Sequence, residues 1–232
     1  MRTALITGTN RGIGLEFVRQ YAKDGWRVFA CCRNPATAEA LNLLATQYPN
    51  QITVHPLDVT SHHQIEQLSQ ALSNQTIDLL INNAGVYPPE HGDAFRATDY
   101  AAWAYAFAVN TMAPLKMAEA FIQQISTSQL KTVIAITSKM GSIADNRGGG
   151  SYIYRSSKAA VNIVMKSLSI DLSSNQVTAV LLHPGWVRTD MGGPNALITT
   201  EQSVTGMRRV ISNLKFSDSG KFYAFDGQIV PW

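Results

Sequence analysis

The sequence of 232 residues contains few cysteines, few charged residues and no long apolar run. Its two cysteines, Cys31 and Cys32, are adjacent in an apolar stretch, which is typical of buried thiols in a reducing compartment rather than of a disulfide framework. No apolar run approaches the roughly 20 residues that a membrane-spanning helix needs, and no separate signal-peptide pattern opens the chain. We therefore expect a cytoplasmic protein without a membrane span.

The charge pattern also excludes several partners. The formal net charge is only +3, and the lysines and arginines are scattered, so neither nucleic acid nor a membrane surface is expected as the main partner. The five histidines do not have paired metal-ligand spacing, and we predict no metal site. A hydrophobic content of 45% and this length are typical of one globular domain, which we assign to residues 1–232.

Apolar runs alternate with segments of helical period along the whole chain. This alternation predicts an α/β protein with a three-layer Rossmann fold, in which helices cover both faces of a doubly wound parallel sheet of about seven strands. Segments 141–151 and 191–200 have the weakest patterns and are predicted to be loops. The predicted strands are Thr3–Thr7, Arg27–Cys32, Ile52–His55, Ile77–Ile81, Thr132–Thr137, Val177–Leu182 and Phe222–Phe225.

A glycine cluster follows the first predicted strand. Between this strand and the first helix the chain reads Thr7-Gly8-Thr9-Asn10-Arg11-Gly12-Ile13-Gly14. Glycines here allow a tight turn and a close approach to a pyrophosphate, which free N–H groups at the helix N-terminus can bind. Alone, such a cluster could be a mere turn, but its place in a strand–helix unit favours dinucleotide binding through Gly8, Asn10, Arg11, Gly12, Ile13 and Gly14.

The spacing Gly-x-x-x-Gly-x-Gly differs from the more common Gly-x-Gly-x-x-Gly. With it, the chain resembles the short-chain dehydrogenase/reductase family over essentially its whole length. The family's other motifs occur in order as Asp58-Val59, Asn82-Asn83-Ala84-Gly85, Asn110, Ser138, Tyr154 with Lys158, and Pro184-Gly185. The resemblance implies oxidoreductase activity and the strand order 3-2-1-4-5-6-7.

The end of the second strand indicates which dinucleotide is bound. A site that prefers NAD carries an acidic residue about twenty residues beyond the glycines. Here Cys32 is followed by Arg33, and Arg11 lies in the glycine turn, so two guanidinium groups could bind a 2′-phosphate. We predict NADP(H) rather than NAD(H); the alternative is that both arginines are ordinary surface charges.

The resemblance assigns further contacts to the cofactor. Asp58 and Val59 are expected near the adenine, and Asn83, Ala84 and Gly85 beside the ribose and nicotinamide. The nicotinamide end is expected to meet Pro184, Gly185, Trp186, Val187 and Thr189.

Tyr154 and Lys158 can supply acid–base chemistry. Four residues apart on a helix, they share one face, and a nearby ammonium is expected to lower the tyrosine pKa towards working pH. Tyr152 lies off the face of Lys158 and is not a candidate. Ser138, at the end of a strand, is expected to hydrogen-bond the substrate oxygen. The resemblance implies that Asn110 helps to hold a water connected to Lys158 and that Lys158 also contacts the nicotinamide ribose. The alternative is that the Tyr154–Lys158 spacing marks an ordinary amphipathic helix, as it more often does in an arbitrary sequence.

The segment from Pro184 to Gly193 and the last seven residues resemble the branch that contains the carbonyl reductase Sniffer and the C-signalling factor of developing bacteria. Carbonyl reduction is therefore expected, and an apolar pocket of Tyr87, Met140, Trp186 and Met191 favours aldehydes, ketones or quinones.

Two other function classes stay open. The first is a non-catalytic NADP(H)-binding sensor or an intercellular signalling protein, which would not need the complete Ser138, Tyr154 and Lys158 set. The second is a sugar-nucleotide epimerase, which carries a different glycine spacing. Family habit further predicts a homodimer or homotetramer formed through the helices expected over Asp99–Ile125 and Tyr152–Leu172.

Overall fold

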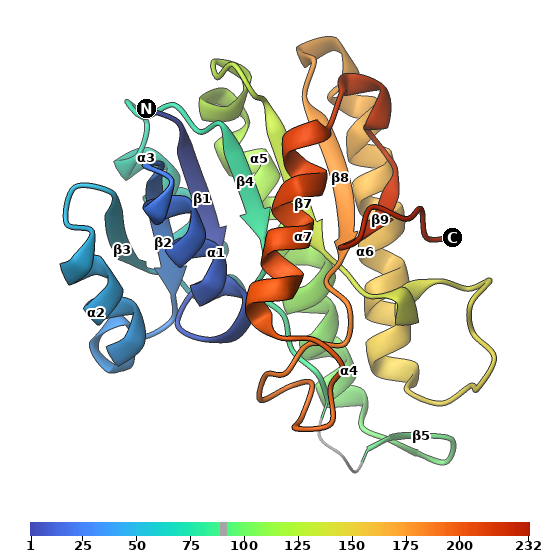
Figure 1. Cartoon of the computed structure of the whole chain (residues 1–232). Helices are drawn as coiled ribbons and strands as arrows, with labels where there is room; N and C mark the ends of the chain where they lie inside the picture. Colours follow the sequence, from blue (N-terminus) through green and yellow to red (C-terminus); the bar gives the residue numbers. More distant parts are fainter. Residues whose placement is uncertain (89–91) are drawn as a thin grey trace.

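A sheet of seven parallel strands forms the middle layer of the computed structural model, which describes residues 1–88 and 92–232 (Figure 1). The strand order is β3-β2-β1-β4-β7-β8-β9, which confirms the predicted order. Every predicted strand is present, with each boundary within two residues. The strands are β1 (Thr3–Thr7), β2 (Arg27–Cys32), β3 (Ile52–Pro56), β4 (Leu79–Asn82), β7 (Thr132–Ile136), β8 (Thr178–His183) and β9 (Phe222–Ala224).

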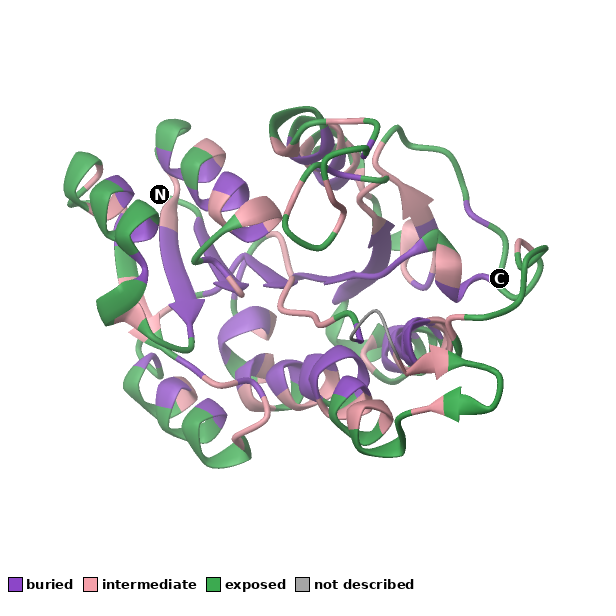
Figure 2. Cartoon of the chain, turned by 90° about the horizontal axis from the view of Figure 1, so that it is seen from below, coloured by how far each residue is buried: buried purple, intermediate pink, exposed green. Residues whose placement is uncertain are grey.

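Helices cover both faces of this sheet, so the predicted three-layer Rossmann fold is confirmed. Figure 2 shows the buried strands between two layers of helices that are buried on their inner sides and exposed on their outer sides. One layer consists of α1 (Gly12–Lys23), α2 (Glu39–Gln47) and α7 (Thr200–Asn213), and the other of α3 (His62–Ala71), α5 (Ala113–Ser126) and α6 (Tyr152–Asp171).

The central strand β1 explains why the strand sequences are continuously apolar. Ile6 belongs to the hydrophobic cluster beneath α1 and packs with Phe17, whereas its neighbour Leu5 belongs to the opposite cluster with Phe121. Successive strand residues point to opposite faces, and here both faces are covered. Full burial of such side chains contributes roughly 1.5–3 kcal/mol each.

The helix predicted over Asp99–Ile125 is interrupted. It consists of α4 (Tyr100–Phe107), a π-helical turn at Ala108–Met112 and then α5. A π turn holds one more residue than an α turn, and such turns occur frequently at functional sites. Asn110 is the middle residue of this turn. The second long helix is found as α6, almost as predicted.

Candidate active site

A cleft of about 870 Å³ opens where β1, β2, β4, β7 and β8 end. In Figure 1 these carboxyl ends lie at the lower edge of the sheet, near α4 and the loop that precedes α7. Ligands of open α/β sheets bind in this position. Sixteen of the predicted site residues line the cleft: Gly8, Asn10, Arg11, Gly12, Ile13, Gly14, Arg33, Asp58, Val59, Asn83, Ala84, Gly85, Tyr154, Lys158, Pro184 and Thr189.

The glycine turn is shaped by close backbone contacts. Gly8 has a φ of +69°, which side chains rarely adopt, and a Cβ on Gly14 would lie 2.1 Å from the Gly8 carbonyl oxygen. Asn83 braces the turn, because its Nδ2 donates to the carbonyl oxygens of Thr7 (2.9 Å) and Gly8 (3.0 Å). The turn is therefore held in a fixed shape by β4 as well as by its own glycines.

Helix α1 begins at this turn without a cap. Its N-cap residue, Arg11, makes no side-chain capping bond, and the first turn contains no acidic residue. The first N–H groups of a helix have no partner within the helix, and its dipole favours an anion there. The start of α1 thus offers N–H donors to a phosphate in the cleft.

Both arginines proposed to recognise a 2′-phosphate line this cleft, and each has a protein partner. Arg11 forms an exposed ion pair with Asp190, which follows β8. Arg33 Nη1 donates to the Tyr105 hydroxyl on α4 at 3.4 Å. No acidic residue occupies the tip of β2, where Arg33 directly follows Cys32. Two cations from separate loops therefore line the same cleft.

Tyr154 and Lys158 also line the cleft and are buried, with 8% and 5% of their surface exposed. The Lys158 Nζ donates to the carbonyl oxygen of Ile136 at 3.0 Å and lies 5.7 Å from the centre of the Tyr154 ring. The ring of Tyr87 packs on that of Tyr154, with 4.5 Å between their centres. The two side chains form one compact group, as their spacing predicts.

The expected lowering of the Tyr154 pKa is wrong for the protein alone. Burial raises the pKa of Tyr154 to about 12; the Ser138 hydroxyl lowers it and Tyr87 raises it by smaller amounts. Burial also lowers the pKa of Lys158 to about 8, because desolvation disfavours the ammonium. Tyr154 is therefore a neutral phenol at neutral pH and holds a proton that it can donate.

Ser138 and Asn110 stand beside this pair but do not line the cleft. Ser138 follows β7 and is buried; its Oγ accepts a hydrogen bond from the Met140 N–H at 3.1 Å. The Asn110 side chain accepts from the Val86 N–H (2.8 Å) and donates to the Val86 carbonyl (2.9 Å) and to Ser157 Oγ (3.0 Å). The amide of Asn110 thus joins the loop after β4 to α6.

The segment after β8 is divided between the cleft and its own loop. Pro184 and Thr189 line the cleft, whereas Gly185, Trp186 and Val187 do not. Gly185, with a φ of +86°, lies against Ile198, where a Cβ would be only 2.7 Å from the nearest side-chain atom. The Trp186 indole donates to the Gly192 carbonyl at 2.8 Å, and Val187 is buried. These three residues shape the loop before α7, and their direct contact with a cofactor remains a prediction.

Comparison with known proteins places this site in a family. The family model described as short chain dehydrogenase matches residues 2–197. The chain belongs to this family. It is 46% identical over 156 residues to C-signal of Myxococcus xanthus, covering 67% of this chain and 93% of that protein.

Two solved structures match this short chain dehydrogenase over its whole length. NADPH-bound carbonyl reductase from chicken fatty liver has a TM-score of 0.92 and 34% identity, covering 100% of this chain and 99% of that one. Carbonyl reductase Sniffer of D. melanogaster has a TM-score of 0.92 and 31% identity, covering 100% of both chains. Both the predicted family and the predicted branch are confirmed.

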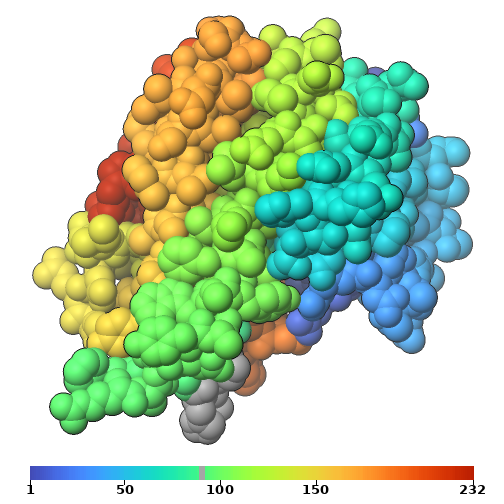
Figure 3. Space-filling model, turned by 180° about the vertical axis from the view of Figure 1, so that it is seen from behind, coloured from blue at the N-terminus to red at the C-terminus, as the bar shows by residue number. Residues whose placement is uncertain are grey.

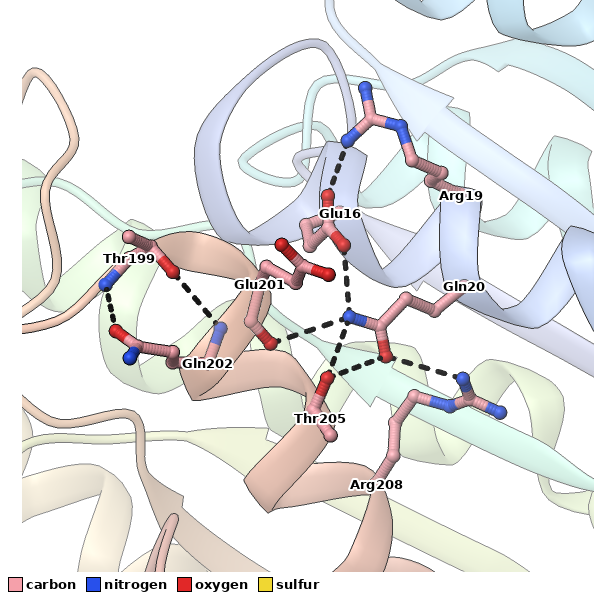
Figure 4. A network of polar contacts seen from close by, with 8 residues as sticks. All are labelled: Glu16, Arg19, Gln20, Thr199, Glu201, Gln202, Thr205 and Arg208. Carbon is pink, nitrogen blue, oxygen red and sulfur yellow. Dashed lines mark hydrogen bonds and ion pairs between the residues drawn. The ribbon is translucent and has the colours of Figure 1, made fainter.

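A polar network fastens α7 of this dehydrogenase to α1 (Figure 4). Gln20 Nε2 donates to Glu16 Oε1 at 2.9 Å and to Thr205 Oγ1 at 3.1 Å, and its Oε1 accepts from Arg208 at 3.2 Å. Glu16, a largely buried acid, also pairs with Arg19, which lines the cleft. The network therefore ties the helix after the glycine turn to the helix after the β8 loop.

Several cleft residues were not among the predicted ones. The cleft is also lined by Arg19, Tyr105, Arg188 and Asp190. No motif marks Arg19 on α1 or Tyr105 on α4, whereas Arg188 and Asp190 lie in the segment that resembles the branch. Asp190 could have been predicted, because it follows Thr189 within the segment from Pro184 to Gly193. Of the four predicted pocket residues, Met191 lines the cleft, whereas Tyr87, Met140 and Trp186 do not.

Within residues 1–88 and 92–232, no three His, Cys, Asp or Glu side chains gather so that they could hold a metal ion. Among the helices of the same ranges, none has the length and apolarity needed to cross a membrane.

Proposed function

We propose that this short chain dehydrogenase is an NADP(H)-dependent carbonyl reductase that uses Ser138, Tyr154 and Lys158. One observation carries the proposal: a buried tyrosine–lysine pair lies in the same cleft as an uncapped helix start behind a glycine turn. The first group can exchange a proton and the second can bind a pyrophosphate. NADPH-bound chicken carbonyl reductase, with the same fold, supports the choice of cofactor.

The residues present fit a dinucleotide. The contact between Gly14 and Gly8 leaves no room for a Cβ, so backbone can approach a phosphate there. Arg11 and Arg33, which line the cleft, would bind the 2′-phosphate of NADP, and Arg11 would then exchange or share Asp190. Asp58 is positioned by its own turn, with Oδ1 accepting from Thr60 Oγ1 at 2.7 Å. When bound, NADPH supplies the hydride that reduces the carbonyl carbon.

In the proposed mechanism Tyr154 donates its phenolic proton to the carbonyl oxygen. With a pKa of about 12, the phenol is fully protonated at neutral pH and is a ready donor for reduction. Lys158, with a pKa of about 8, is mostly an ammonium at pH 7, and its charge stabilises the phenolate left after the transfer. Ser138 would hydrogen-bond the carbonyl oxygen as negative charge develops on it.

The proposed substrates are apolar aldehydes, ketones or quinones. Tyr87, packed on Tyr154, and Met191, which lines the cleft, would give the substrate site an apolar character. Such surfaces bind apolar groups, while Tyr154 and Ser138 would orient the single polar oxygen.

The test is oxidation of NADPH and NADH with a panel of aldehydes, ketones and quinones. We expect turnover with NADPH and a loss of at least about 100-fold in Tyr154→Phe, which keeps the ring but removes the proton. Tyr152→Phe is the matched control, because Tyr152 is half-exposed and lies two residues earlier on α6. Full activity of Tyr154→Phe would refute the mechanism.

A signalling role is the second candidate, favoured by the 46% identity to C-signal. In that case the chain would bind NADPH tightly without turning over any compound of the panel. Tyr154→Phe would then leave the signalling response of receptive cells unchanged.

A homodimer or homotetramer and a cytoplasmic location are further parts of the proposal. Figure 3 shows the face that carries α4, α5 and α6, the helices that would meet a second copy. Ile163 and Ile170 of α6 and Met112 of the π turn are more than half exposed. Light scattering of the purified protein tests the oligomeric state.

A further inference from the structure

Helix α6, which carries Tyr154 and Lys158, begins without a cap from its own sequence. Its N-cap residue, Ser151, has a left-handed backbone with a φ of 47° and makes no side-chain capping bond. No acidic residue lies in the first turn. Because the first N–H groups of a helix need partners from outside it, the start of α6 depends on another segment.

That segment is the short hairpin of β5 (Asp93–Ala94) and β6 (Ala97–Thr98). One carboxylate oxygen of Asp93 accepts from the Ile153 N–H at 2.6 Å, and the other accepts from the Tyr154 N–H at 3.4 Å. The backbone carbonyl of Asp93 also accepts from the Ser151 N–H at 3.1 Å. Asp93 is thus an N-cap supplied from about sixty residues away, and one of its bonds is to Tyr154 itself.

The same hairpin also fixes α4. Asp99, directly after β6, accepts from the N–H groups of Ala101 (2.9 Å) and Ala102 (3.0 Å) at the start of α4. The Asp99 N–H in turn donates to the Gly92 carbonyl at 2.8 Å. One turn of chain therefore holds the starts of two helices, α6 with Tyr154 and α4, which leads to Asn110.

We propose that Asp93 is a positioning residue for Tyr154, and this inference rests on the proposed function. Tyr154 is the third residue of α6, where a helix frays when its cap is lost. The carboxylate also neutralises the positive end of the helix dipole. By holding the first turn closed, Asp93 keeps the phenol where the reacting oxygen will be; displacements of about 1 Å can cost two orders of magnitude in rate.

The kinetic test compares Asp93→Ala with Asp93→Asn, which keeps one acceptor oxygen. We expect Asp93→Ala to lower kcat about tenfold, equivalent to about 1.4 kcal/mol, while the Kd for NADPH stays unchanged because the Asp93 carboxylate bonds to the start of α6 and not to the glycine turn. Asp93→Asn should recover most of kcat. Asp171→Ala, at the exposed far end of α6, is the matched control and should match the wild type.

The inference is overturned if Asp93→Ala keeps kcat within twofold of the wild type, if Asp93→Asn is no better than Asp93→Ala, or if Asp171→Ala loses as much. Failure of the wild type on every substrate would instead refute the proposed function.

A second readout needs neither activity nor a stable variant. In the wild type, the amides of Ile153 and Tyr154 should exchange hydrogen more slowly than those of Gly12 and Ile13, at the uncapped start of α1. Fast exchange at Ile153 would show that Asp93 does not hold the first turn of α6, and it would overturn the inference.

Discussion

Replacement of Gly14 by alanine tests whether the glycine turn is built for a dinucleotide. A Cβ at this position would lie 2.1 Å from the Gly8 carbonyl oxygen and 2.6 Å from Asn83 Nδ2. These atoms belong to the turn and to its brace, so the clash cannot be relieved by moving one flexible side chain. The turn must shift away from α1.

The free-energy change has two parts of opposite sign. Overpacking of this kind costs typically about 1–3 kcal/mol. Alanine also stabilises a helix interior by about 1 kcal/mol relative to glycine, which offsets part of that cost in the unfolding free energy. Binding gains nothing from helix propensity, because free and bound protein share the helix. The free protein relieves the overpacking by shifting the turn, and binding must restore the original turn at a cost of about 1–3 kcal/mol. NADPH binding should therefore weaken by about 5- to 150-fold, taking 1.4 kcal/mol as tenfold.

The assay is NADPH titration by calorimetry, beside thermal unfolding. Gly148→Ala is the matched control, since a Cβ there meets no atom within 4 Å. We expect Gly14→Ala to stay folded, with a Tm within about 4 °C of the wild type for a net change near 1 kcal/mol, and the control to bind normally. A folded Gly14→Ala protein that binds NADPH within twofold of the wild type would refute the reasoning.

Three further changes have definite expected outcomes. Arg33→Asp should weaken NADPH binding about 10- to 100-fold, as expected for the loss of charge-assisted hydrogen bonds, and should weaken NADH binding less. Equal losses for both cofactors in titrations would contradict binding of the 2′-phosphate by Arg33. Asn110→Ala leaves the Val86 backbone groups without their side-chain partner and should lower the unfolding free energy by about 1–3 kcal/mol in urea melts; an unchanged midpoint would count against this account. Burial and Lys139 lower the pKa of His183 to about 4, below its value in the unfolded chain, so the unfolded chain binds more protons between pH 6.5 and 4. The unfolding free energy should therefore fall by about 2 kcal/mol between pH 7 and pH 5 because of His183. Urea melts at the two pH values should show a smaller fall for His183→Gln.

Most of the fold could be predicted from local sequence patterns. The strand β1, the glycine turn and α1 could be predicted because their signals lie within one stretch of chain, and the same holds for the Tyr154–Lys158 spacing on α6. Alternation of apolar segments was enough for the layers, since a parallel sheet requires helices on both faces.

The parts that could not be predicted depend on contacts between distant segments. Burial of Tyr154 beneath Tyr87 raises its pKa, and the sequence spacing with Lys158 suggested the opposite sign. The cap of α6 by Asp93 joins residues far apart in the chain, and no pattern around Asp93 reveals it. The pairing of Arg11 with Asp190 likewise exists only once β1 and β8 share a sheet.

The π turn at Ala108–Met112 constrains how this protein can change length. This turn takes up one residue more than an α turn, so removing one residue would leave a regular α-helix with the faces of α4 and α5 unchanged, whereas adding a residue would rotate one helix against the other by about 100°. Trp103 on α4, whose indole donates to Ser156 on α6, would then face away from its partner. Single-residue insertions should therefore be absent here among functional relatives, even where the surrounding loops vary freely in length.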